Sequence, residues 1–317
     1  MDFGIISAGN HAVNRIIPAI SKSGNRIVAI YSTDREKGTR ISRELGAEYF
    51  GDIDKMVGYG YEASYISSPN NLHFEYARKS LERGKHVLLE KPMTLSVDNS
   101  ERLVDLSIKE GRRLKLGFHL RFHPGIRVIK EHVESGRLGK VMAISGNFSS
   151  LSRRSGSKTW WDMPESAGGG AIVGRGVHVM DSFVFLLGRE IESVMAFNTP
   201  RCQTIEETFS ILARYKSGII AHALSSRSIP GGSNDLIVLG SEHVAKLTNA
   251  FDTKVNSKLI VDDTELSNYS DYDMYEAEIK DFTSNGNTIA DAVDGLLSTR
   301  LHIGAQKSAC EGREIFI

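Results

Sequence analysis

Two side chains in the sequence, Lys91 and His178, could move a proton to or from a bound substrate. Lys91 stands in Glu90-Lys91-Pro92, directly after the apolar run His86–Leu89. If that run is a parallel strand, the ammonium lies where open α/β sheets bind ligands, and burial can lower its pKa enough for proton transfer near neutrality. His178 follows a glycine-rich segment. A lone histidine in an apolar helix is more often a core residue, but an ordinary pKa of about 6.5 suits proton transfer in either direction.

A turn that could hold phosphate follows the first apolar run. It reads Ser7-Ala8-Gly9-Asn10-His11-Ala12 and opens a helix, as in dinucleotide-binding fingerprints, although Ser7 and Ala12 stand where glycines are usual. Gly9 matters most, because only a residue without a side chain lets the backbone approach a pyrophosphate at a helix N-terminus. The alternative is a tight turn without a cofactor. We expect a dinucleotide at Ser7, Gly9, Asn10 and His11.

The end of the second apolar run indicates which dinucleotide binds. An NAD site usually has a carboxylate there for the ribose hydroxyls, but this chain has Tyr31 and Ser32. Hydroxyl groups at Ser32 and Thr33, with Arg35 nearby, suit an added phosphate better. Asp34 lies past the strand and is expected to cap the following helix. The sequence therefore favours NADP over NAD.

These motifs require a sheet that brings them together. In the first 120 residues, short apolar runs alternate with amphipathic segments, which predicts βαβ units and a parallel sheet covered on both faces. We expect strands at Phe3–Ile6, Ile27–Tyr31, Ala63–Ser67, His86–Leu89 and Leu114–Phe118, and helices at Val13–Ser23, Arg35–Leu45, Leu72–Arg83 and Asp98–Glu110.

The pattern changes after about residue 120, so we predict a dinucleotide-binding (Rossmann) domain at 1–120 and an α+β substrate-binding and oligomerisation domain at 121–317. Several runs alternate apolar and polar residues, which is typical of a large, mostly antiparallel sheet with one free face. A C-terminal helix at about 275–310 is expected to pack back on the first domain. The second-domain strands are expected at Val141–Ser149, Ile191–Thr199, Thr208–Tyr215, Gly218–Arg227, Leu236–Leu239 and Ala245–Leu247, after one helix at Gly125–Ser135.

Composition excludes several classes of function. The chain has 39 Lys and Arg against 39 Asp and Glu, which gives no electrostatic case for a nucleic acid or an anionic membrane. No apolar run approaches the roughly 20 residues of a membrane helix, and the N-terminus lacks a basic signal-peptide start. We treat Cys202 and Cys310 as ordinary residues and find no spacing typical of a metal site. A cytoplasmic protein is the expected class.

Several motifs, taken in order, resemble one family, that of glucose–fructose oxidoreductase and inositol 2-dehydrogenase (Gfo/Idh/MocA). The resemblance runs nearly end to end. Its motifs are Ser68-Pro69-Asn70-Asn71-Leu72-His73, Gly84-Lys85-His86-Val87-Leu88-Leu89-Glu90-Lys91-Pro92, Gly117-Phe118-His119-Leu120-Arg121-Phe122-His123-Pro124, Ser135-Gly136-Arg137-Leu138-Gly139, Gly168-Gly169-Gly170-Ala171, Gly176-Val177-His178-Val179-Met180-Asp181 and Glu278-Ile279-Lys280-Asp281-Phe282.

The resemblance implies roles for these residues. Lys91 would lie beside the nicotinamide and the substrate oxygen, before an often cis bond to Pro92, and His178 would share the proton transfer. Glu90 would orient Lys91 or contact the cofactor. The nicotinamide ribose would be lined by Ser68, Pro69, Asn70 and His73, although His73 could equally lie on a helix surface.

The chain departs from the family at one position. Most active members carry Asp four residues before the histidine, but this chain has Gly174, and Arg175 adds a cation that could hold a carboxylate or phosphate. Asp181 lies one turn after His178 and could orient its ring. The remaining candidates for the substrate pocket are His119, Arg121, Trp160 and Trp161; the tryptophans could stack on a sugar ring or pack under a loop.

The resulting hypothesis is an NAD(P)-dependent oxidoreductase that transfers a hydride to or from a sugar, a polyol or a related small hydroxy or carbonyl compound. Two alternatives stay open. Gly174 in place of the aspartate could mark a nucleotide-binding sensor without turnover, and the resemblance also admits an NAD-dependent glycosidase, since some relatives cleave glycosidic bonds. The free face of the second-domain sheet predicts a homodimer or homotetramer.

Overall fold

The computed structural model describes residues 1–152, 159–230, 234–284 and 289–317, which form two compact units. The first unit contains Met1–His119 and Met274–Thr299, and the second contains Leu120–Asp273 and Arg300–Ile317. Although the sequence predicts a second domain at 121–317, residues 274–299 belong to the first unit. The helix α10 (Ala292–Glu311) is continuous, with its first eight residues in the first unit.

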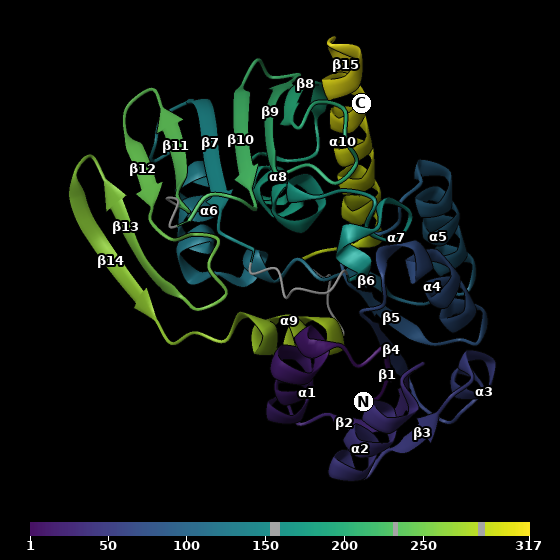
Figure 1. The fold of residues 1–317 in the computed structure, drawn as a ribbon. Helices are drawn as coiled ribbons and strands as arrows, with labels where there is room; N and C mark the ends of the chain where they lie inside the picture. Colours follow the sequence, from purple (N-terminus) through teal and green to yellow (C-terminus); the bar gives the residue numbers. More distant parts are fainter. Residues whose placement is uncertain (153–158, 231–233, 285–288) are drawn as a thin grey trace. The chain divides into compact units, whose positions relative to one another are not determined.

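The first unit is built on a six-stranded parallel sheet (Figure 1), as the strand–helix alternation predicted. Its order is β3-β2-β1-β4-β5-β6, so the connections reverse direction beside β1. In open sheets of this kind, ligands bind at the carboxyl ends of the strands near such a reversal. The strands are β1 (Asp2–Ile6), β2 (Arg26–Tyr31), β3 (Glu48–Phe50), β4 (Ala63–Ile66), β5 (His86–Leu89) and β6 (Leu114–Leu116).

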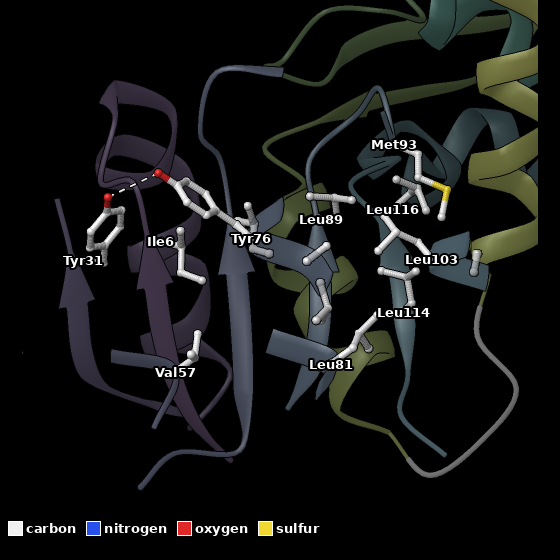
Figure 2. Close-up of a cluster of buried hydrophobic side chains, with 14 of the residues drawn as sticks. Ile6, Tyr31, Val57, Tyr76, Leu81, Leu89, Met93, Leu103, Leu114 and Leu116 are labelled. Atoms are coloured by element: carbon white, nitrogen blue, oxygen red, sulfur yellow. Dashed lines mark hydrogen bonds between the residues drawn. The ribbon is translucent and has the colours of Figure 1, made fainter. Parts of the chain in front are cut away.

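Two apolar cores cover the faces of this sheet. Figure 2 shows one of them, in which Ile6, Leu89 and Leu116 pack with side chains from helices such as Leu81 and Leu103. On the opposite face, Phe3 and Ile5 pack with residues from α1 and α9. The helical elements are η1 (Ala12–Ile16), α1 (Ile17–Lys22), α2 (Arg35–Leu45), α3 (Ile53–Val57), η2 (Asn70–Leu72), α4 (His73–Glu82), α5 (Val97–Lys109) and α9 (Met274–Thr283).

The second unit is built on a nine-stranded sheet of order β14-β13-β12-β11-β7-β10-β9-β8-β15. All neighbouring pairs are antiparallel except β7 and β10, which confirms the predicted mostly antiparallel sheet. The strands are β7 (Val141–Ser149), β8 (Ile191–Thr199), β9 (Thr208–Tyr215), β10 (Ile220–Ser226), β11 (Leu236–Gly240), β12 (Val244–Leu247), β13 (Asn256–Val261), β14 (Thr264–Ser270) and β15 (Ile315–Phe316).

Helices α6 and α8 pack on one face of the nine-stranded sheet (Figure 1). The contact is close enough that a Cβ atom at Gly146 of β7 would lie 2.5 Å from Val179 of α8. The opposite, outer face carries exposed apolar side chains. The remaining elements are η3 (His119–Phe122), α6 (Pro124–Glu134), η4 (Trp160–Asp162), α7 (Pro164–Ala167), η5 (Ile172–Gly176) and α8 (Val177–Leu187).

One expectation about apolar segments is wrong. The segment Pro164–Leu187, which contains α7, η5 and α8, is long and apolar enough to span a membrane by length and composition alone. However, 78% of its most apolar window is buried inside the fold. The sequence pattern missed its length because five glycines and Arg175 interrupt it. Burial of this degree is typical of the core helix of a globular unit.

The expectation that the two cysteines are ordinary residues is also wrong, because Cys202 and Cys310 form a disulfide in the second unit. Cys202 lies in the turn after β8, and Cys310 lies near the end of α10. The end of α10 runs beside β8, where the Ala196 amide donates a hydrogen bond to Ser308 Oγ at 3.0 Å. Two cysteines 108 residues apart therefore meet only through the fold, which their spacing in the sequence could not show.

Candidate functional site

The predicted phosphate loop follows β1 in a constrained conformation. Ser7 has a φ of 69°, in the left-handed region that favours glycine, which accounts for the glycine usual at this position. Its amide donates to Tyr31 O at 3.0 Å, and its carbonyl accepts from Ser67 Oγ at 2.8 Å. A Cβ atom at Gly9 would meet nothing within 4 Å. Packing of the protein thus does not require a glycine there, whereas close approach of a pyrophosphate does.

Glu90 connects this loop with the predicted catalytic lysine. His11 Nε2 lies 3.2 Å from Glu90 Oε1, and the Tyr65 hydroxyl donates to the same oxygen at 2.9 Å. Burial alone would raise the pKa of Glu90, but the neighbouring charges of His11 and Lys91 outweigh it and hold the pKa at about 2. Glu90 is therefore ionised and provides a fixed negative charge beside the Lys91 ammonium.

Lys91 follows Glu90, the first residue after β5, at the carboxyl end of the parallel sheet. Its bond to Pro92 is cis, as the family resemblance implied. His73 is 1% exposed and is not a surface residue of its helix. Its Nδ1 lies 2.7 Å from Pro92 O and its Nε2 3.1 Å from Ser68 O. His73 thus joins the Ser68-Pro69-Asn70 segment to the segment that carries Lys91.

The residues after β2, where the sequence predicts contacts with the cofactor ribose, include a helix cap and a buried serine. Asp34 Oδ1 accepts from the Lys37 amide at 3.0 Å and caps α2, as expected from the sequence. Ser32 is buried, and its hydroxyl accepts from the Asp34 amide at 3.1 Å. Thr33 and Arg35 are exposed. The carboxylate nearest the end of this strand is thus engaged in a helix cap.

His119 is buried rather than open at the end of its strand. Its ring stacks on Tyr275 with a centroid distance of 4.5 Å, and the edge of His11 meets the same tyrosine. Burial lowers the pKa of His119 to about 3, against the opposing charge of Glu90. The ring is therefore neutral at physiological pH, and a role for it as a cation is excluded.

The positively charged side chain of Arg121 forms an ion pair with a carboxylate of the second unit. Its Nη2 lies 2.6 Å from Asp181 Oδ1, its Nε bonds both carboxylate oxygens, and both side chains are buried. The prediction that Asp181 orients the His178 ring stays a prediction beside this ion pair. The sequence missed it because Arg121 and Asp181 lie 60 residues apart and meet only in the folded chain.

His178 lies in the first turn of α8 and is 5% exposed. The chain before this helix is held by Glu206, which the sequence analysis did not identify. The Glu206 carboxylate accepts from the Gly170 amide at 2.9 Å and from the Ile172 amide at 2.6 Å. A Cβ atom at Gly170 would lie 2.0 Å from Glu206 O, so close backbone packing requires this glycine. Burial raises the pKa of Glu206 to about 7, against the hydrogen bonds from these amides. The carboxylate pair Glu206-Glu207 directly before a strand was the only signal for it in the sequence.

Arg175 lies in η5, one turn before His178. Its guanidinium donates to the hydroxyl and carbonyl oxygens of Ser150 and to the hydroxyl of Ser152. A Cβ atom at the neighbouring Gly174 would meet nothing within 4 Å. Trp160 and Trp161 stack on each other at 4.1 Å and are partly exposed.

The predicted residues thus gather in two groups. Strands β1, β4 and β5 bring the phosphate loop, the Ser68 segment and Glu90-Lys91 together in the first unit. In the second unit, the Phe148 ring lies near both the Arg175 guanidinium, at 5.9 Å, and the His178 ring, at 6.2 Å. Throughout the described part of the chain, no group of His, Cys, Asp or Glu side chains is arranged to hold a metal ion.

Comparison with known proteins identifies the family. Residues 1–118 match the model of an oxidoreductase family with an NAD-binding Rossmann fold, and residues 126–246 match that of the GFO/IDH/MocA C-terminal domain. A D-xylose 1-dehydrogenase (NADP(+)) of Haloferax volcanii is 30% identical over 232 residues, which are 73% of this chain and 70% of that protein. The chain belongs to the Gfo/Idh/MocA oxidoreductase family.

Other proteins match this chain over different shares of its length and of their own. An uncharacterized oxidoreductase of Rhizobium meliloti is 35% identical over 61% of this chain, a match that spans 58% of that relative. A 1,5-anhydro-D-fructose reductase of Ensifer adhaerens is 25% identical over 98% of this chain and 97% of its own. The crystal structure of an aldose-aldose oxidoreductase from Caulobacter crescentus in complex with glycerol has the same fold, with a TM-score of 0.91 at 22% identity over 100% of this chain and 99% of that one.

Proposed function

We propose that this protein transfers a hydride between NADP(H) and a carbon that bears a hydroxyl or carbonyl group on a sugar or polyol. The observation that carries the proposal is the Glu90 carboxylate, which ties the Lys91 segment to the phosphate loop through His11. The relatives named above as a xylose dehydrogenase and an anhydrofructose reductase support the substrate class.

The residues present fit a dinucleotide. The space beside Gly9 and the left-handed turn at Ser7 leave the backbone open to a pyrophosphate at the carboxyl end of β1. When bound, the nicotinamide supplies the hydride chemistry. The protein holds and moves the proton. We propose that Lys91 donates a hydrogen bond to the substrate oxygen and so polarises the reacting carbon. His178 then exchanges a proton with the same substrate oxygen.

The test is Lys91→Met, with Lys109→Met as a control because Lys109 is exposed on α5. We expect Lys91→Met to lower the rate of hydride transfer at least about 100-fold while NADPH binding, measured by its fluorescence, persists. Lys109→Met should change neither. The unaltered protein could instead bind the nucleotide tightly and turn over no sugar or polyol. That result would contradict the proposed hydride transfer and favour a nucleotide-binding sensor.

The preference for NADP is a finer proposal. It is supported by the hydroxyl groups of Ser32 and Thr33, by the exposed Arg35 and by the use of Asp34 as a helix cap. Arg35→Ala should reduce kcat/KM for NADP about tenfold and leave that for NAD unchanged. Arg43→Ala, at an exposed position of the same helix, is the matched control. Equal kcat/KM for the two cofactors in the unaltered protein would contradict the preference.

We also propose that the outer face of the nine-stranded sheet joins subunits into a homodimer or homotetramer. Strand pairing places five exposed apolar side chains on this face, where a contiguous apolar surface is unusual in a monomer. The molar mass measured by light scattering should be at least that of a dimer. Leu212→Glu should shift the measured mass toward that of the monomer. The five side chains are Phe197, Leu212, Ile220, Leu239 and Val244.

The cytoplasmic location is a proposal that the disulfide makes testable. Disulfides persist in oxidising compartments and are rare in the cytosol. If the protein is cytoplasmic, alkylation of intact cells before lysis should trap Cys202 and Cys310 as free thiols. A pair that is oxidised at that stage would contradict the proposed location.

A further inference from the structure

Arg175 is a rigidly held cation whose hydrogen-bond partners are all neutral. Nε donates to Ser150 Oγ at 3.1 Å, and Nη2 donates to Ser150 Oγ at 2.8 Å and to Ser152 Oγ at 3.1 Å. Among the described residues, Nη1 has no hydrogen-bond acceptor, and it is not one of the buried nitrogens sealed from solvent. The contacts fix the plane of the guanidinium and leave one terminal nitrogen available.

The two arginines that are buried in the described part of this unit, Arg121 and Arg227, are paired with carboxylates. Arg121 pairs with Asp181, and Arg227 lies 3.4 Å from Asp162 and 4.0 Å from Glu207. Within the described ranges, Arg175 has no carboxylate within ion-pair distance. Burial lowers the pKa of Arg175, and the charge of Arg227 lowers it further, yet an arginine stays protonated in proteins. A half-buried positive charge without a counter-charge is unfavourable and is relieved by an anion.

The surroundings of Arg175 place such an anion near the predicted proton-transfer residue. The Phe148 ring lies 5.9 Å from the Arg175 guanidinium and 6.2 Å from the His178 ring, so one aromatic side chain borders both. Gly174 adds open space on the same helical turn. A small molecule with an acidic group at one end and a hydroxyl group at the other could reach both side chains.

We infer that Arg175 binds an acidic group of the substrate, so that the protein acts on an anionic sugar or polyol, a carboxylate or a phosphate ester. The inference rests on the proposed function and assigns its substrate class. A guanidinium presents its N–H groups in a planar fork that matches the oxygens of a carboxylate or a phosphate, and such charge-assisted hydrogen bonds are stronger than those to neutral hydroxyls.

The experiment compares three ligands that share one ring: D-glucose, D-glucuronate and D-glucose 6-phosphate. Their binding to the full chain with NADP present is measured by calorimetry at constant ionic strength, and turnover is followed by nicotinamide absorbance. We expect at least one of the two anions to bind about 10- to 100-fold more tightly than glucose. The anion that does so distinguishes a carboxylate from a phosphate ester.

Variants assign the effect to Arg175. Arg175→Gln should remove the preference for the anion, whereas Arg175→Lys should retain part of it. Arg127→Gln, at an exposed position on α6 of the same unit, should leave all three affinities unchanged. Should Arg175→Gln fail to fold, the lysine variant and a selective weakening of anion binding by added salt provide the same test.

Three results would overturn the inference: equal affinity for glucose and both anions, a preference that persists in Arg175→Gln, or no binding of either anion. The proposed function fails differently. If an anion binds through Arg175 but neither the anions nor a panel of neutral sugars and polyols changes nicotinamide absorbance, the inference stands and the hydride transfer does not. If neutral sugars are turned over without any preference for anions, the hydride transfer stands and the binding of an anion by Arg175 does not.

Discussion

His123 is predicted to make the second unit sensitive to acid. The side chain is fully buried, its Nδ1 accepts a hydrogen bond from the Gly125 amide at 3.0 Å, and its Nε2 lies 3.0 Å from Ser257 Oγ. His123 Nδ1 caps α6 by accepting from the Gly125 amide, which lies in the first turn and needs an acceptor, so the neutral ring with its proton on Nε2 is required. Burial lowers the pKa of His123 to about 4.

The size and sign of the effect follow from this pKa. In the unfolded chain the pKa is about 6.5, so below that pH the unfolded state binds a proton that the folded state does not. The stability that depends on the neutral ring is present in full above pH 6.5 and is lost as the pH falls toward 4. At pH 5 the loss is about 2 kcal/mol of unfolding free energy.

The assay is denaturant unfolding at pH 7.5 and pH 5, followed by tryptophan fluorescence. Both tryptophans, Trp160 and Trp161, lie in the second unit, so their signal reports that unit. His123→Asn keeps a capping acceptor but does not titrate, and the difference in unfolding free energy from the unaltered protein should shrink by about 2 kcal/mol between the two pH values. Ser257→Ala should lose about 1 kcal/mol but retain the acid sensitivity. A difference between His123→Asn and the unaltered protein that does not change with pH would refute the reasoning.

Three further predictions concern the stability of the same unit. Asp181→Asn removes the carboxylate from the buried ion pair with Arg121 and should lower the unfolding free energy by about 3–5 kcal/mol, measured by the same fluorescence; a loss under 1 kcal/mol would contradict the contribution of this pair. Gly170→Ala should be destabilising by about 1–3 kcal/mol because its Cβ meets Glu206 O at 2.0 Å, whereas Gly174→Ala, with nothing within 4 Å, should not be; equal effects would contradict the packing. Reduction of the disulfide, which closes a loop of 108 residues, should lower the thermal midpoint by an amount equivalent to about 2–5 kcal/mol, and an unchanged midpoint would show that the bond adds no stability.

The elements with strong periodicity could be predicted from the sequence, and those fixed by their neighbours could not. Apolar runs such as Phe3–Ile6 and His86–Leu89 indicated the parallel sheet, because strands buried on both faces consist of apolar residues. The short strand β3 (Glu48–Phe50) was missed, since it carries one exposed residue and only partly buried ones. Strands β13 and β14 were also missed: β14 is largely exposed and shows little apolar alternation.

The candidate site was predictable to the extent that local sequence places a side chain. Lys91 was placed at a strand end and Asp34 at a helix cap from their immediate neighbours alone. The partners of Arg121, His73 and Glu206 were not, because each meets residues that are distant in the sequence or bonds to backbone atoms. Backbone acceptors and donors leave no mark on residue type, so only the folded chain reveals such contacts.

The division of the first unit between two stretches of chain has a consequence during synthesis. Tyr275, Ile279 and Phe282 belong to a core that also contains Phe3 and Ile5, so this core lacks part of its surface until α9 has been made. About 180 residues separate His119 from Thr299. At a synthesis rate of about 5–20 residues per second, the nascent nucleotide-binding unit waits roughly 10–40 s with one apolar face uncovered. The first unit is thus completed only after residues 120–273 of the second unit have been made, and a chain halted at residue 120 would expose the face that α9 covers.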